Sequence, residues 1–252
     1  MDARPADARY HRAAHYLLCL GCLCAILLIV VALVRYPGNA ATMNGYRILG
    51  AVSLLVLLAS GAWVFWRGRR ATDADTPIVL RMGIVGGFFL GLLWVIEIGF
   101  NNFVPPDIST GAARGVVDNV FWAIIAVGIL GLSVMGAYRT RRVWSGVRVG
   151  LWSGFVSGLV ACLMGLFLVV VWMRLLLRDP LAISEWAALG ASNGAPDMAT
   201  YLAYETMAGA IGHLTVLGVA MGLLLGIIGS LVGYGVALLK QRAPWAGGRA
   251  AS

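Results

Sequence analysis

Charged side chains are scarce in this chain of 252 residues. Asp, Glu, Lys and Arg make up only 12% of it, whereas apolar residues make up 60% and the mean hydropathy is +0.86. Soluble domains carry about 25% charged residues, so this composition excludes an ordinary water-soluble globule, and the apolar content also excludes disorder. The chain is therefore expected to be an integral membrane protein.

Residue types that carry chemistry are also few. The chain has 11 acidic residues, 3 histidines and 4 cysteines. It contains no GxxxxGK[ST], HExxH or GxSxG motif, and no GxGxxG between a strand and a helix. The sequence therefore predicts no cofactor and no ATP-driven step by this chain alone, and it gives little support for an enzyme.

The first apolar stretch carries histidines and cysteines on one helical face. His11, His15, Cys19 and Cys22 are separated by steps of four, four and three residues. They cannot share one ion, because 11 residues of helix cover about 16 Å. We interpret them as small apolar and interfacial side chains and predict no metal site.

Six apolar stretches are long enough to cross a membrane. A bilayer core about 30 Å thick requires roughly 20 apolar residues in a helix. The predicted spans are 16–34, 48–66, 82–100, 116–138, 149–172 and 207–239. The last is the longest, and Pro196, Asp197 and Thr200 predict that its helix begins before the membrane does.

The loop 174–206 is the longest stretch between spans. Its apolar pattern from Leu181 to Leu189 predicts a short interfacial helix with Trp186 at the headgroup level, ended by residues 190–196. No separate soluble domain is expected, so the chain forms one transmembrane domain.

Basic residues set the predicted orientation. Of the 19, 14 fall in the segments 1–15, 67–81, 139–148 and 240–249. The positive-inside rule then places both termini in the cytoplasm. Since topology accounts for the positive charge, no nucleic-acid partner is expected, and the preference for arginine, 18 of the 19, favours a bacterial inner membrane.

Acidic residues divide in the opposite sense. Glu97 lies within the predicted span 82–100, while Asp118 falls at the outer end of the span 116–138. Six of the 11 acidic residues fall on the predicted outer side: Asp107, Asp118, Asp179, Glu185, Asp197 and Glu205.

An internal repeat links two of the spans. Residues 81–92 match residues 148–159 at six of twelve positions without a gap. The match favours three helical hairpins repeated in the same orientation, as in some transporter halves, although glycine-rich membrane helices also resemble one another without duplication.

Three spans carry glycines at four-residue spacing. This spacing places small residues along one side of a helix, where another backbone can approach closely. We interpret the stripes first as internal packing, and as an oligomer seam or sliding surface second. The residues are Gly83, Gly87 and Gly91, then Gly150, Gly154 and Gly158, then Gly218, Gly222 and Gly226.

Glu97 is the first candidate for a functional residue, because an ionisable side chain in a span is costly and by default suggests function. It lies 11 positions from Gly86 and so shares a helix face with a small residue, which predicts that it points toward protein. Its depth, about one turn from the outer edge, leaves two further readings open: contact with water, or an ion pair with Arg114.

Other polar residues gather at similar depth: Asn101, Asn102, Asp118, Asn119, Glu205 and His213. If the bundle brings these ends together, they form an outward-facing polar site that binds a cation or relays protons. Ordinary interfacial polarity is the competing interpretation.

The sequence therefore predicts an all-α polytopic bundle of six transmembrane helices with both termini in the cytoplasm. The first functional hypothesis is a small permease or the membrane subunit of a transporter, with Glu97, Asn101, Asn102, Asp118, Glu205 and His213 as binding or transport residues. A non-catalytic scaffold that packs through its glycine faces is the alternative, and a membrane enzyme acting on a lipid-linked substrate is a third. The expected partners are the lipid bilayer and either a second copy or another membrane subunit.

Overall fold

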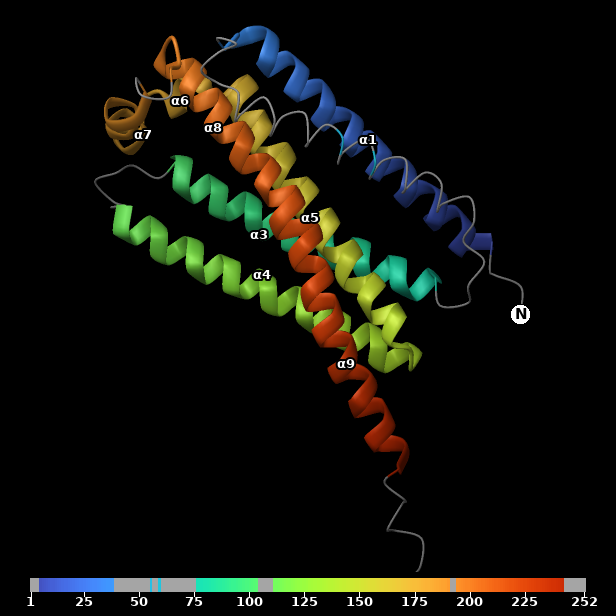
Figure 1. Ribbon diagram of the computed structural model, residues 1–252. Coiled ribbons are helices and arrows are strands. Elements are labelled where there is room, and N and C mark those ends of the chain that lie inside the picture. Colours follow the sequence, from blue (N-terminus) through green and yellow to red (C-terminus); the bar gives the residue numbers. More distant parts are fainter. Residues whose placement is uncertain are drawn as a thin grey trace, which may run out of the picture.

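The computed structural model describes residues 5–38, 55, 59, 76–103, 111–190 and 194–242. Within these residues every regular element is a helix (Figure 1). The long helices are α1 (Pro5–Arg35), α3 (Thr76–Phe103), α4 (Gly111–Thr140), α5 (Val143–Val171), α8 (Met198–Gly212) and α9 (Met221–Arg242). Short elements are α6 (Met173–Leu176), α7 (Pro180–Glu185) and two π-helical segments, η1 (Trp186–Gly190) and η2 (His213–Ala220).

Five helical stretches in the described part are long and apolar enough to cross a membrane. They are Ala13–Arg35, Pro77–Phe103, Ala112–Thr140, Val143–Val171 and Met198–Gln241. The chain is thus an all-helical, multi-pass membrane protein. The predicted span 48–66 lies outside the described residues, apart from two helical positions, 55 and 59.

Each of the five helices begins before its predicted apolar run, and all but α5, which ends at Val171 and not at the predicted residue 172, also extend past its end. The third predicted span, 82–100, is the centre of a helix that begins at Thr76 and ends at Phe103. Polar residues at these ends do not break a helix, so the apolar run marks the membrane-embedded part only. Pro77 is tolerated because the first turn of a helix needs no N–H donor there.

Helix α5 is the centre of the bundle. About two thirds of its apolar stretch is buried, 67% against 28% for α4, which explains why α5 is apolar all round rather than on one face. It packs against α1, α3, α4, α8, η2 and α9. The described chain is therefore organised as a ring of helices around α5.

The two repeated segments, 81–92 and 148–159, lie side by side in α3 and α5. A Cβ atom at Gly83 would touch Trp152, and one at Gly91 would touch Val160. Because the residue numbers of the contacting pairs rise together in both helices, α3 and α5 run in the same direction. A duplication of the two segments stays a prediction.

The nine glycines of the three stripes all face other helices within the chain. The stripe of α5 meets the stripe of η2 and α9: a Cβ at Gly150 would lie 2.5 Å from the Cα of Gly226, and one at Gly154 would lie 2.7 Å from the Cα of Gly222. Such contacts are possible only between residues without side chains. The stripes are therefore occupied by intramolecular packing.

The last predicted span, 207–239, is part of one continuous helix built from α8, η2 and α9, of which the 44 residues Met198–Gln241 form the candidate membrane span. At about 1.5 Å per residue it is roughly 66 Å long, more than a bilayer core requires. Figure 1 shows it crossing over α5 at an angle, with α6 and α7 beside its first turns. The predicted outer loop 174–206 is consequently shorter than expected, because its last nine residues are already helical.

Asp197 starts this helix, as the sequence predicts. Its side chain accepts a hydrogen bond of 2.7 Å from the backbone N–H of Thr200. Helical elements are also present where the sequence predicts a short interfacial helix, as α7 and η1, which ends at Gly190; their place at the membrane interface stays a prediction. Trp186 packs against Tyr201 with ring centroids 5.7 Å apart, so it is anchored to α8.

We expect Asp197→Ala to lower the free energy of unfolding by about 1 kcal/mol, because the first turn of α8 loses its cap. Asp197→Asn should leave it nearly unchanged, since asparagine caps equally well. Thermal unfolding of the purified chain in detergent checks both. Equal losses for the two variants would show that charge, not capping, makes the contribution.

The bundle has two chemically different ends. The start of α1 and the end of α9 lie at the same end, because His15 contacts Trp152 near the start of α5 and Lys240 reaches Tyr138 near the end of α4. Basic residues gather here: Arg81, Arg139, Arg141, Arg142, Arg148 and Lys240. The opposite end holds most of the described acidic residues.

Candidate functional site

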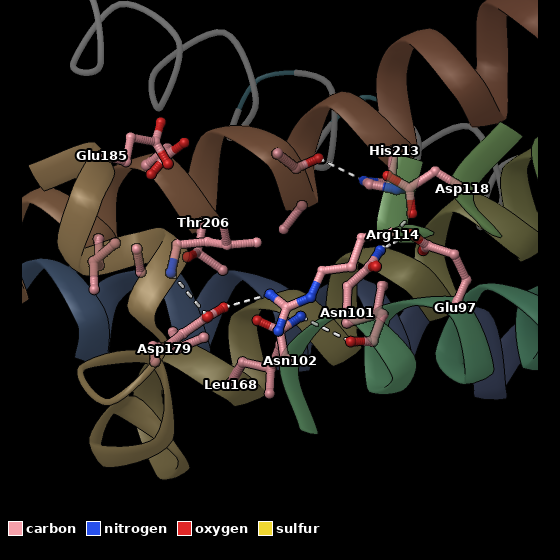
Figure 2. A pocket seen from close by; sticks show the side chains of 18 residues that line it. Glu97, Asn101, Asn102, Arg114, Asp118, Leu168, Asp179, Glu185, Thr206 and His213 are labelled. Atoms are coloured by element: carbon pink, nitrogen blue, oxygen red, sulfur yellow. Dashed lines mark hydrogen bonds and ion pairs between the residues drawn. The ribbon is translucent and has the colours of Figure 1, made fainter. Parts of the chain in front are cut away.

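A pocket of about 480 Å³ opens at the acidic end of the bundle. Its walls come from the end of α3, the start of α4, α7 and the first half of the 198–241 helix (Figure 2). Five carboxyl side chains line it, together with one arginine and one histidine. These residues are Glu97, Asp118, Asp179, Glu185, Glu205, Arg114 and His213.

All six candidate residues from the sequence line this one pocket: Glu97, Asn101, Asn102, Asp118, Glu205 and His213. They come from three separate helical stretches. The bundle therefore brings together the helix ends on which the predicted polar site depends. We call this cavity the acidic pocket.

Glu97 lies on the inner wall of the acidic pocket. Only 5% of its surface is exposed, which confirms that it points toward protein. Its Oε1 accepts a hydrogen bond of 2.6 Å from Nδ2 of Asn101, one turn further along α3. Its Oε2 is buried and has no hydrogen-bond partner among the described residues.

The same amide of Asn101 binds a second carboxylate. Its Nδ2 donates to Oδ1 of Asp118 at 2.5 Å, while its own Oδ1 is buried without a partner in the described structure. One amide group thus bridges two carboxylates from neighbouring helices. We call Glu97, Asn101 and Asp118 the amide-bridged trio; Figure 2 shows it beside Arg114 and His213.

The ion pair between Glu97 and Arg114, one of the expectations from the sequence, is not the ion pair that the structure shows for this arginine. Arg114 instead binds Asp179, with 2.6 Å between its Nη1 and Oδ2 of the aspartate, and both side chains are nearly buried. Asp179 sits in the turn before α7, where its Oδ1 also accepts from the backbone N–H of Leu181 at 3.1 Å. Arg114 lies one turn before Asp118 in α4, so it reaches across the pocket mouth to α7, and Asn101 occupies the space beside Glu97.

His213 is held in place from two sides. Its Nδ1 lies 2.8 Å from the backbone oxygen of Gly209, and its ring meets that of Trp94 edge-on with centroids 4.7 Å apart. The ring also lies within electrostatic range of Asp118. His213 is the first residue of η2, and π-helical segments inside α-helices occur frequently at functional sites.

A second pair of carboxyl groups lies on the far wall. Glu205 of α8 faces Glu185 at the end of α7. Glu185 also accepts a hydrogen bond of 3.2 Å from the hydroxyl of Tyr201. Asn102, by contrast, donates to the backbone oxygen of Ile98 in its own helix at 2.7 Å, so its amide is already satisfied.

The sequence did not single out Arg114, Asp179, Glu185 or Thr206 as site residues, although all four line the acidic pocket. One signal was available for Arg114: it precedes Asp118 by four residues, which places both on one helix face. Asp179 and Glu185 carried no such signal, because α7 folds back over the pocket through tertiary contacts.

Metal-binding clusters of the histidine and cysteine type are not found in the described chain. No group of three or more His, Cys, Asp or Glu side chains there has the geometry to hold a metal ion. The described cysteines are free, and His15 packs edge-on against Trp152. A ligand of the acidic pocket would meet carboxylate and amide oxygens.

Comparison with protein-family models, with curated proteins and with solved structures finds no match to this chain.

Proposed function

We propose that the protein is a small permease, or the membrane subunit of a transporter, that takes up a cationic substrate through the acidic pocket. The observation that carries the proposal is Glu97, a carboxylate in a membrane-spanning helix that is buried at the pocket wall with one oxygen unpartnered. A side chain of this kind is expensive to keep in a membrane, and such residues commonly mark ion and substrate pathways.

The charges of the pocket favour a cation. Among its lining residues five are acidic and one is arginine, and Arg114 is already bound to Asp179. Clefts lined by one sign of charge concentrate ions of the opposite sign. The four carboxyl groups of Glu97, Asp118, Glu185 and Glu205 thus leave the pocket with an excess of negative charge that attracts cations.

The proposed orientation places the acidic pocket on the outer face. Basic residues gather at the opposite end, which the positive-inside rule assigns to the cytoplasm. We propose on this basis that both termini are cytoplasmic and that the membrane is a bacterial inner membrane.

The scaffold alternative receives less support. It requires glycine faces that dock a second copy or a partner helix, whereas the contacts of Gly150, Gly154 and Gly158 are made with η2 and α9 of the same chain. A membrane enzyme is the second candidate, because Asp118 lies near both Glu97 and His213, as acid–base chemistry requires. His213→Gln would abolish turnover by such an enzyme, while binding and flux of a cation would persist.

Glu97→Gln tests the transport proposal. Proteoliposomes containing the purified chain should take up one of H⁺, Na⁺, K⁺ or Mg²⁺ faster than empty liposomes, as followed by entrapped indicator dyes. We expect the substitution to lower this flux at least tenfold, since it removes the charge that admits the cation.

The matched control is Asp197→Asn, which changes an acidic residue to its amide at the same end of the bundle but outside the pocket. Its flux should equal that of the original chain. A chain that works only with a partner subunit is tested by expressing the same variants in cells that lack the original protein. Unchanged flux in Glu97→Gln, with normal amounts of protein in the membrane, would reject the proposal.

A further inference from the structure

We infer that the amide-bridged trio of Glu97, Asn101 and Asp118 is a binding site for a hard divalent cation of the Mg²⁺, Mn²⁺ or Ca²⁺ type. The inference deepens the proposed function, on which it rests in taking the acidic pocket as the place where a ligand binds. It names the class of that ligand and the three side chains that hold it.

Two carboxylate oxygens of the trio converge on one point. Oε1 of Glu97 and Oδ1 of Asp118 lie 2.6 Å and 2.5 Å from the same amide nitrogen, so they are no more than about 5 Å apart. The two carboxyl groups also interact directly. A cation with bonds of about 2.0–2.6 Å to oxygen can bind both oxygens at this separation once Nδ2 of Asn101, which now lies between them, has turned away.

Glu97 also has an oxygen atom that no described residue contacts by a hydrogen bond. Oε2 of Glu97 is buried without a hydrogen-bond partner in the described structure, although the whole residue is only 5% exposed and lines the pocket. Leaving a buried carboxylate oxygen unsatisfied costs several times the net contribution of an ordinary hydrogen bond. The unpartnered Oε2 of Glu97 therefore indicates a ligand that contacts this oxygen.

Asn101 gives the site two states. Its Nδ2 now lies between the carboxylates, and its Oδ1 is buried without a partner among the described residues. An amide nitrogen and oxygen are nearly equal in size, so rotation of the group by about 180° exchanges a donor for an acceptor. In the empty site the amide holds the two carboxylates together; with a cation present, its oxygen becomes the third ligand.

The donor set selects the class of cation. Carboxylate and amide oxygens are hard ligands, which suit Mg²⁺, Ca²⁺ and Mn²⁺ rather than Zn²⁺ or Cu²⁺. Two carboxylates match the charge of a divalent ion, and this balance matters in a membrane where net charge is costly. Mg²⁺ in proteins is commonly bound by one or two carboxylates with several waters, which the pocket has volume to hold.

Mn²⁺ binding to the full-length chain in neutral detergent tests the inference. Bound Mn²⁺ loses the six-line electron paramagnetic resonance signal of the free ion, so titration counts the sites. We expect one saturable site for each chain, emptied by excess Mg²⁺. Glu97→Gln and Asp118→Asn should each weaken Mn²⁺ binding at least tenfold.

Asn101→Asp separates a cation site from a purely structural hydrogen-bond network. If Asn101 only donates to two carboxylates, a third carboxylate destabilises the chain and leaves Mn²⁺ binding unchanged. If the trio binds the ion, the added charge should tighten Mn²⁺ binding at least threefold. Asn102→Asp is the matched control. It adds the same charge one residue further along, where the amide donates to the backbone oxygen of Ile98, and it should change the affinity for Mn²⁺ less.

Unfolding of the unsubstituted chain keeps the test independent of the variants. Mn²⁺ or Mg²⁺ should raise its melting temperature in a saturable manner, whereas equal ionic strength supplied by Na⁺ should not. No saturable Mn²⁺ binding, or no selective effect of divalent ions, would overturn the inference. Cation flux that needs Glu97 but occurs without saturable Mn²⁺ binding would overturn the inference and keep the proposed function. Saturable Mn²⁺ binding without any cation flux would keep the inference and overturn the proposed function.

Discussion

Gly154→Leu should largely abolish folding of the helix bundle. A Cβ atom at this position would lie 2.7 Å from the Cα of Gly222 and would overlap the backbone oxygen of Gly218. Both contacts are with backbone, which cannot rotate away as a side chain can. Overpacking in a core usually costs about 1–3 kcal/mol, and here a four-carbon side chain must separate two helices, so we expect a loss at the upper end or beyond. Size-exclusion chromatography and thermal unfolding in detergent measure it.

Gly131→Leu is the matched control. It makes the same chemical change on α4, where a Cβ atom meets nothing within 4 Å. The variant should be as stable as the original chain or slightly more so, because leucine is the better helix former by about 1 kcal/mol. A stable, monodisperse Gly154→Leu protein would contradict the close contact between α5 and the 198–241 helix.

Arg114→Met should destabilise the acidic end of the bundle by about 3 kcal/mol or more. It leaves Asp179 with a buried charge and no cation opposite, and breaking a nearly buried ion pair from one side costs about 3–5 kcal/mol. Because the pair joins the start of α4 to the turn before α7, we also expect α7 to become accessible. The melting temperature and the rate of proteolysis within residues 180–190 report the two effects.

Asp179→Asn combined with Arg114→Met completes a double-mutant cycle. Asparagine still accepts from the N–H of Leu181, so the cap of α7 is kept while both charges are removed. Most of the lost stability should return, because no unpaired charge remains. If the double variant were no more stable than Arg114→Met, the loss would come from the packing of the arginine stem and not from its charge.

Helix positions were predictable from the sequence because long apolar runs leave few alternatives in a membrane. Asp197 was predictable as a start signal, since its capping chemistry is local. The exact helix ends were not, as Thr76 and Phe103 show: a helix continues through polar residues once it leaves the apolar region. The π-helical segment from His213 also carried no local signal, because η2 packs against the glycine stripe of α5.

The lining of the acidic pocket was predictable in part, and its pairings were not. Sequence depth placed Glu97, Asp118 and His213 at one end of the bundle, and one pocket contains them all. The partner of Arg114 depended on where α7 folds, and α7 is held by tertiary contacts that no short segment encodes. The bridging role of Asn101 likewise required the relative rotation of α3 and α4.

The uninterrupted helix from Met198 to Gln241 has a mechanical consequence. It carries Glu205 in the wall of the acidic pocket and ends beside Lys240, which reaches Tyr138 at the opposite end. The π-helical η2 lies between these two ends, and around Gly154 its contact with α5 is backbone against backbone, without interlocking side chains. An axial shift at one membrane face would therefore pass along this helix through η2 before it reached the other face.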